Sequence, residues 1–315
     1  MSESESEQKR ENLPTSAEII DAIRDAGWLL EQETANTLRE NGYYVATGKA
    51  FPDPDEPTTS REVDAVAYRE VYRNQELSFN IGVRIIAECK QSAMPYVAIG
   101  GPADGYESSR DRKEQVFRFE RIEIGREDLE GGSYRLKQVT AREYLGLDML
   151  DGNPWSSTFI GDQLTRMDRK KTWLAENRGI FPSLIYPLAK ALTYYRSSES
   201  QFRGGNVHTP GRDWASIIFY YPIVVTSAPV FVVDASKSSV SAVRTPWVEL
   251  SREIKSKKVD GKFNMHVVSS HNLDEFLEMQ VERFASGIAE LAESDPERFI
   301  TREDHSFLPS QESKA

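Results

Sequence analysis

Ile81-Gly-Val-Arg-Ile-Ile-Ala-Glu-Cys-Lys90 is the stretch from which the rest of this chain is interpreted. It is strongly apolar as far as Ala87 and then carries an acid, a thiol and an amine. Side chains alternate between the two faces of a strand, so Glu88 and Lys90 point one way and Cys89 the other. An acid and an amine at the end of a buried strand are costly unless they have a task. The stretch predicts a central strand that ends in a functional site.

Two further acids precede this strand. Asp64 lies in a strand-like run, Arg61-Glu-Val-Asp-Ala-Val-Ala-Tyr68, and Glu31 lies on the predicted helix before it. Glu31 borders the apolar stripe of that helix and should therefore face the sheet. Carboxylates on adjacent strands are the hard oxygen ligands that Mg²⁺ prefers, and Mn²⁺ is its natural substitute.

The combination predicts a metal-dependent phosphodiesterase site. Asp64 and Glu88 would hold the metal, with the backbone carbonyl of Cys89 as a further ligand and Glu31 as an additional candidate. Lys90 would hold or help deprotonate the attacking water and offset phosphate charge. A metal can lower the pKa of a bound water and neutralise charge that builds on phosphoryl oxygens, which is the chemistry of phosphodiester hydrolysis.

Composition sets the limits of this interpretation. The chain has 315 residues, of which 39% are hydrophobic and 28% charged, enough for a sizeable core. No apolar run approaches a membrane span, and a single cysteine excludes an internal disulfide framework, so we expect a cytoplasmic protein without a membrane partner. The net charge of -11 argues against nucleic acid as a partner, but phosphate binding needs only a local basic face. Two basic clusters are candidate DNA contacts, with a solvated surface as the alternative: Arg110, Arg112 and Lys113, and Lys170 and Lys171.

Hydrophobic periodicity places the main elements. Helices are predicted near 15–24, over 28–41 and 183–196, and from 273 to about 293. Strands are predicted over 43–47, 61–69, 78–90, 214–226, 229–234, 247–250 and 265–269, and Phe51-Pro-Asp-Pro-Asp-Glu-Pro57 is predicted to be a loop because of its prolines. We expect a disordered tail over 1–13, one elaborated α/β domain over 14–300 with 92–182 as an insertion, and a flexible tail over 301–315.

Over residues 28 to 91 the chain resembles the PD-(D/E)XK nuclease superfamily, which includes restriction endonucleases. The order is helix, strand, strand with Asp64, and strand with Glu88-Cys-Lys90, and the helix resembles the Mrr-like branch. The resemblance implies a restriction endonuclease-like core, a central mixed β-sheet flanked by helices. It makes Asp64 and Glu88 the metal acids, Lys90 the catalytic lysine and Glu31 the helical acid. The family's proline before the aspartate is replaced by Val63, and we prefer Asp64 to the literal Pro-Asp pairs at Asp53 and Asp55.

Each of these residues also has a structural alternative. The Glu88–Lys90 pair could be a surface ion pair, Asp64 could end an edge strand, and Glu31 could pair with Arg84. Cys89 should face the core rather than act as a reactive thiol, because nothing marks a partner base. Gln91 could assist the site, although its position on the opposite face favours a structural role.

The leading expectation is a magnesium-dependent endodeoxyribonuclease in restriction, defence or DNA repair, acting through activated water without a covalent intermediate. The alternative is a catalytically silent module of the same fold that binds nucleic acid or a protein. Nucleases that cut both strands often dimerise, and the closing helix 273–293 is a candidate homodimer surface.

Overall fold

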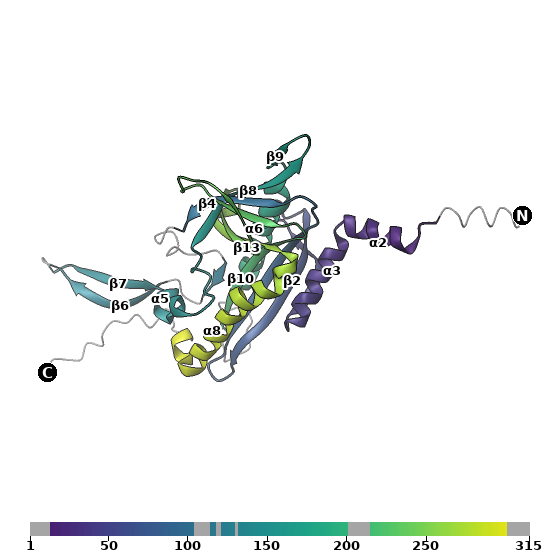
Figure 1. Ribbon diagram of the computed structural model, residues 1–315. Helices are drawn as coiled ribbons and strands as arrows, with labels where there is room; N and C mark the ends of the chain where they lie inside the picture. Colours follow the sequence, from purple (N-terminus) through teal and green to yellow (C-terminus); the bar gives the residue numbers. More distant parts are fainter. Residues whose placement is uncertain (1–12, 104–113, 118–120, 130–131, 201–214, 301–315) are drawn as a thin grey trace, which may run out of the picture.

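Twelve strands build one large mixed sheet in this computed structural model, which describes residues 13–103, 114–117, 121–129, 132–200 and 215–300 (Figure 1). Residues 1–12 of the predicted N-terminal tail and all of 301–315 lie outside the described residues. The main path of the sheet is β1-β2-β3-β10-β14-β13-β8-β4-β11-β12. Across the described residues no helix is both long and apolar enough to cross a lipid bilayer.

The first half of the sheet surrounds the predicted central strand. β1 (Tyr44–Pro52), β2 (Ser60–Asn74) and β3 (Phe79–Lys90) form an antiparallel meander, and β10 (Ala215–Thr226) runs parallel to β3. β14 (Asp260–Ser269) is parallel to β10 and antiparallel to β13 (Trp247–Lys255). The predicted strands over 61–69, 78–90 and 214–226 are confirmed, and those over 247–250 and 265–269 are longer than predicted.

The second half of the sheet contains the predicted strand over 229–234 and several strands that the sequence pattern did not predict. β8 (Phe159–Arg169) is parallel to β13 and antiparallel to β4 (Tyr96–Pro102). β11 (Val230–Asp234) lies parallel to β4, and β12 (Ala242–Thr245) pairs with β11. Two short strands are side branches of the sheet, β5 (Gln115–Val116) on β10 and β9 (Trp173–Glu176) on β8. Part of the 92–182 region therefore belongs to the main sheet.

A separate hairpin of β6 (Arg121–Asp128) and β7 (Tyr134–Thr140) extends away from the body in Figure 1. It is followed by α5 (Ala141–Leu145) and η1 (Leu147–Met149). At the other side, α2 (Ser16–Asp25) buries none of its residues and projects from the body. It begins at a capping box between Thr15 and Glu18.

The two faces of the sheet are covered by different helices. α3 (Trp28–Glu40) and a C-terminal helix of three segments, α7 (Leu273–Phe276), η5 (Leu277–Glu282) and α8 (Arg283–Ser294), cover one face, and η6 (Pro296–Ile300) follows them. η4 (Ser270–Asn272) connects β14 to α7. On the opposite face, η2 (Phe181–Ile185) and α6 (Tyr186–Ser200) form one helix. The predicted helices over 28–41, 183–196 and 273–293 are confirmed within a few residues.

Alternation along β3 divides the two cores. Ile85, Ala87 and Cys89 belong to the core beneath α3 and α8, whereas Ile86 belongs to the core beneath α6. Residues of both sheet halves, such as Ile86 of β3 and Ala98 of β4, share this second core. The sheet therefore curls around α6.

The predicted loop at 51–57 begins two residues later than expected. Phe51 and Pro52 are the last residues of β1 and pair with Arg61 and Ser60. β1 is the edge strand of the sheet, so the missing N–H of Pro52 removes no hydrogen bond that the sheet needs. Proline therefore did not end the strand where the sequence pattern indicated.

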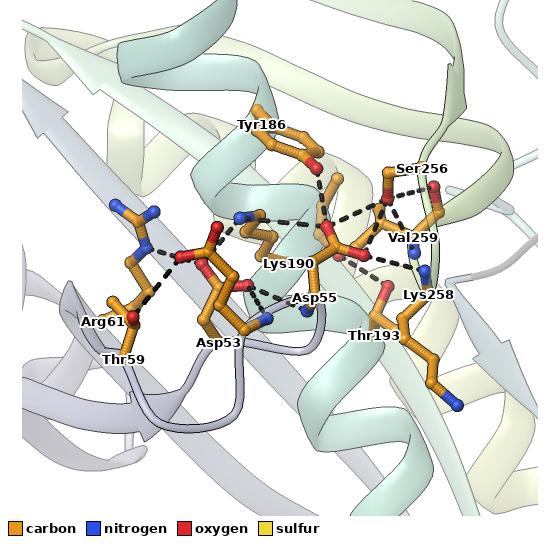
Figure 2. Close-up of polar contacts among 12 residues, drawn as sticks. Asp53, Asp55, Thr59, Arg61, Tyr186, Lys190, Thr193, Ser256, Lys258 and Val259 are labelled. Carbon is orange, nitrogen blue, oxygen red and sulfur yellow. Dashed lines mark hydrogen bonds and ion pairs between the residues drawn. The ribbon is translucent and has the colours of Figure 1, made fainter.

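A buried ion network fastens this edge hairpin to α6 (Figure 2). Lys190 Nζ lies 2.6 Å from Asp53 Oδ2 and 3.8 Å from Asp55 Oδ2. The Asp53 side chain is 0% exposed and also accepts a hydrogen bond from Arg61 Nε at 2.7 Å. A buried carboxylate is tolerated when every lone pair is used, and Asp53 meets that condition.

Asp55 extends the network to the β13–β14 turn. Its carboxylate accepts hydrogen bonds from the Tyr186 hydroxyl at 2.6 Å and from the backbone N–H of Lys258 at 2.7 Å. The Ser256 hydroxyl donates to the same carboxylate at 2.9 Å. Figure 2 shows the Lys258 side chain pointing away from these groups. Asp53 and Asp55 thus connect the edge loop to α6 and to the β13–β14 turn, which are far apart in the chain.

Replacing Lys190 by methionine tests this network. Lys190→Met keeps the volume but leaves Asp53 buried with only Arg61 as its cation, so we expect the free energy of unfolding to fall by about 3 kcal/mol. Urea unfolding followed by circular dichroism at pH 7 measures the change. The control is Lys257→Met, an exposed lysine in the β13–β14 turn, which should change stability by less than about 0.5 kcal/mol. Equal stability of the two variants would contradict the network's role.

Asp53 also predicts a pH dependence of stability. Burial on its own would raise the pKa of Asp53, but hydrogen bonds from Lys190 and Arg61 outweigh it and lower the pKa from 3.8 to about 2. Folding therefore favours the ionised form of Asp53. The contribution of Asp53 to the free energy of unfolding is complete above pH 4 and is lost as the pH falls towards about 2. Its size is on the order of 2 kcal/mol. Urea unfolding between pH 7 and pH 2.5 should show a smaller loss for Asp53→Asn than for the wild type, and parallel curves would exclude the effect.

Candidate active site

Asp64 and Glu88 face each other across two neighbouring strands. The antiparallel ladder of β2 and β3 pairs Ala65 with Ala87 and Val66 with Ile86, so the same register places Asp64 opposite Glu88. Directly opposed residues of such a pair have Cβ atoms roughly 5 Å apart. Asp64 Oδ2 also accepts a hydrogen bond from the backbone N–H of Cys89 at 2.6 Å. This bond holds the Asp64 carboxylate against the end of β3.

Lys90 follows on the same face of β3 as Glu88, as the alternation predicts. Burial raises the pKa of both Asp64 and Glu88, and the Lys90 ammonium charge opposes this rise. Lys90 therefore lies within electrostatic reach of the two carboxylates. The parallel neighbour β10 pairs its last residue, Thr226, with Lys90. The backbone of Lys90 therefore lies beside the end of β10.

Glu31 reaches the same place from the first turn of α3. Gly27 caps this helix with a left-handed backbone (φ 90°) and accepts a hydrogen bond from the Glu31 N–H. Burial and the nearby Asp64 carboxylate raise the pKa of Glu31, in that order. Because the charge of Glu31 in turn raises the pKa of Glu88, the helical acid lies in the same electrostatic environment. All four predicted residues are brought together.

The site carries more negative charge than its single amine offsets. Burial is the largest cause that raises the pKa of Glu88 to about 8, and repulsion from Asp64 and Glu31 adds to it. The pKa of Asp64 is also raised, mainly by burial, against the opposing effects of the Cys89 N–H and Lys90. Buried carboxylates that repel each other in this way are stabilised by a bound cation.

A divalent metal fits this donor set as an open site rather than as a cage. No group of three or more His, Cys, Asp or Glu side chains in the described part of the chain is placed to enclose an ion. Mg²⁺ commonly binds through one or two carboxylates and keeps several waters. Asp64 and Glu88 supply two carboxylates. The Cys89 carbonyl lies on the same side of β3 as its N–H and therefore faces Asp64, since both groups of a ladder residue point to one neighbour.

The Cys89 side chain is structural, in agreement with the prediction. It belongs to the core beneath α3, and its Sγ lies 3.5 Å from the Thr34 hydroxyl. Burial raises the pKa of the thiol well above its usual range. A buried thiol of raised pKa has little thiolate character and is a poor nucleophile.

The structure places the remaining candidates elsewhere. Asp53 and Asp55 are engaged by Lys190 and its neighbours, so the literal Pro-Asp pairs serve the edge loop. The Arg84 guanidinium lies over the rings of Tyr68 and Tyr195, at 5.3 and 5.2 Å from their centroids.

The candidate DNA contacts fall into two groups. Arg110, Arg112 and Lys113 fall outside the described residues, whereas Lys170 and Lys171 are exposed between β8 and β9.

Two residues near the site were missed by the sequence interpretation. Thr226 is fully buried beside Lys90, and its hydroxyl accepts a hydrogen bond from the Ala228 N–H. Ser227 Oγ accepts the N–H of Ser92 and donates to its carbonyl, so it ties the exits of β3 and β10 together. Thr226 and Ser227 lie near the site only because β10 pairs in parallel with β3. No local sequence pattern predicts a parallel partner over 130 residues away.

No family model, no curated protein and no solved structure matches this chain. Interpretation of the site consequently rests on its residues and their geometry. The structure shows a mixed sheet flanked by helices, with Asp64 and Glu88 on opposite sides of the β2–β3 ladder at the end of its central strand.

Metal binding can be tested without any assay of activity. We expect calorimetric titration with MgCl₂ or MnCl₂ to show binding to the wild type, and Asp64→Asn and Glu88→Gln each to weaken it at least tenfold, because each removes one charged ligand. Glu33→Gln is the matched control, since Glu33 is an exposed acid two residues beyond Glu31 on α3. Undiminished binding in both site variants would show that the metal site lies elsewhere.

Proposed function

We propose that this protein is a metal-dependent nuclease that hydrolyses phosphodiester bonds in DNA. The observation that carries the proposal is that the register of β2 and β3 places Asp64 opposite Glu88, with Lys90 next on the same face of β3 and the pKa of Glu88 raised to about 8. Perturbed carboxylates beside a lysine are characteristic of catalytic sites. The resemblance to PD-(D/E)XK nucleases over 28–91 supports the same conclusion from the order of the elements.

Three residues form the metal-binding part of the proposed mechanism. The carboxylates of Asp64 and Glu88 and the carbonyl of Cys89 would hold Mg²⁺ or Mn²⁺. The bound ion supplies Lewis acidity and a lowered water pKa. The Cys89 N–H keeps the Asp64 carboxylate oriented through its 2.6 Å hydrogen bond.

Lys90 and Glu31 act on the water and the phosphate. The Lys90 ammonium orients the attacking water and offsets charge on the phosphoryl oxygens. Glu31, with its raised pKa, is placed to receive the proton that the water loses. Water is the nucleophile in this scheme, and the buried Cys89 thiol takes no part in it.

Cleavage of supercoiled plasmid and of single-stranded DNA with Mg²⁺ or Mn²⁺ tests the proposal. We expect Asp64→Asn and Lys90→Met to lower the cleavage rate by at least a hundredfold, because positioned acid–base and charged groups contribute about 10²–10⁴-fold. Glu31→Gln should have a smaller effect, and Glu33→Gln should cut like the wild type.

Two results would contradict the nuclease proposal. Cleavage that persists unchanged in Asp64→Asn would point to another site or a contaminant. DNA binding without cleavage or metal binding would instead favour the catalytically silent module. Comparison of the circular dichroism spectra of all variants separates loss of function from loss of folding.

A further inference from the structure

The β8–β9 hairpin is locally basic in an acidic chain. The paired part of the hairpin, residues 166–176, contains four cations and two acids, although the whole chain has a net charge of -11. Lys170 and Lys171 are exposed where β8 turns into β9. A local positive surface of this kind attracts polyanions. In Figure 1 the hairpin projects from the top of the body.

An aromatic side chain is exposed beside these cations. Trp173 is 52% exposed, and the Arg169 guanidinium lies over its ring at 5.6 Å from the centroid. Arg169 and Trp173 are direct partners in the β8–β9 ladder and so share one face of the hairpin. The ring of an exposed tryptophan offers a platform on which a nucleobase can stack.

The same face of the hairpin leads into a cavity. Trp173 and Ala175 lie two residues apart on one strand and point the same way. Ala175 lines a cavity of about 430 Å³ whose wall also includes Gln163, Thr165 and Asn177. The lining combines polar side chains with apolar ones, so a nucleobase in it could both pack and form hydrogen bonds.

The hairpin is connected to the candidate active site by a short path. Four residues lie between Lys90 and Pro95, whose carbonyl accepts a hydrogen bond from the Met167 N–H at 2.9 Å. A chain segment spans at most about 3.6 Å per residue, so Lys90 and Arg169 lie within roughly 30 Å. At about 3.4 Å per nucleotide, fewer than ten nucleotides bridge the two places.

We propose that the face of the β8–β9 hairpin formed by Arg169 and Trp173, together with the adjoining cavity, binds unpaired nucleotides of the DNA substrate. Trp173 stacks on a base, Lys170 and Lys171 contact phosphates, and the cavity accepts a neighbouring base. Base faces are available for stacking only outside a duplex, so the substrate has single-stranded character. The identity of the polymer rests on the proposed nuclease function.

Fluorescence anisotropy of labelled (dT)₂₀ and of a 20-base-pair duplex, both in EDTA, tests this site without cleavage. We expect Trp173→Ala to weaken (dT)₂₀ binding about tenfold or more, with a much smaller effect on the duplex. The double variant Lys170→Ala/Lys171→Ala should lower the salt dependence of (dT)₂₀ binding by a slope of about 1.4, from two lost phosphate contacts.

The second hairpin provides matched controls. Tyr134 is also 52% exposed and has Arg126 over its ring at 4.1 Å, but it lies on the β6–β7 hairpin. Tyr134→Ala should bind both DNAs like the wild type, as should Lys257→Ala/Lys258→Ala, in which the adjacent lysines of another turn are removed.

Several results would overturn the inference. These are equal (dT)₂₀ affinity of Trp173→Ala and Tyr134→Ala, equal weakening on single strand and duplex, or no binding of either DNA by the wild type. Binding of phosphatidylserine vesicles that depends on Trp173, with (dT)₂₀ binding unaffected, would reassign the hairpin to a membrane surface. Cleavage that requires Asp64 alongside an unaffected Trp173 variant would reject the hairpin and keep the nuclease. Binding of (dT)₂₀ that depends on Trp173, without cleavage, would keep the hairpin site and reject the nuclease.

Discussion

The antiparallel register of β2 and β3 is the constraint on which the site depends. It places Asp64 opposite Glu88 and allows the Cys89 N–H to reach the Asp64 carboxylate. A slip of one residue would turn every side chain of β3 to the other face, so the apolar residues that fix the register also fix the acids. Ile85, Ala87 and Cys89 are buried beneath α3, and Ile86 is buried beneath α6. The two cores thus exclude a slip of one residue.

The protein treats its buried carboxylates in two opposite ways. At the edge loop, Asp53 is satisfied by Lys190 and Arg61, and its pKa is lowered to about 2. At the end of β3, the pKa of Glu88 is raised to about 8 by burial and by like charges. A structural network minimises the energy of its charges, whereas a binding site leaves them uncompensated until the ligand arrives. This contrast distinguishes the Pro-Asp pairs from Asp64 more clearly than their sequences do.

Local patterns predicted the central strand and the three main helices, because alternation and helical periodicity are properties of short segments. The same patterns singled out the four candidate site residues, whose roles stay a prediction. They could not predict that β4 and β8 join the main sheet, since strand pairing is decided by distant partners. Lys190 and Asp53 are 137 residues apart, and Thr226 meets Lys90 only through a parallel pairing. Pro52 misled the prediction because its effect depends on whether its strand lies at an edge, which the sequence does not state.

Net charge is a poor guide to the proposed partner of this chain, because charge acts locally at both places where phosphate would bind. At the end of β3 the excess of acids favours a cation, and a bound cation reverses the sign of the field that a phosphate meets. At the β8–β9 hairpin, four cations and an exposed tryptophan stand apart from the acidic remainder. Beyond about 10 Å, salt screens the repulsion from exposed acids elsewhere on the surface. An acidic protein can therefore hold a polyanion when its few basic groups are concentrated near a metal site.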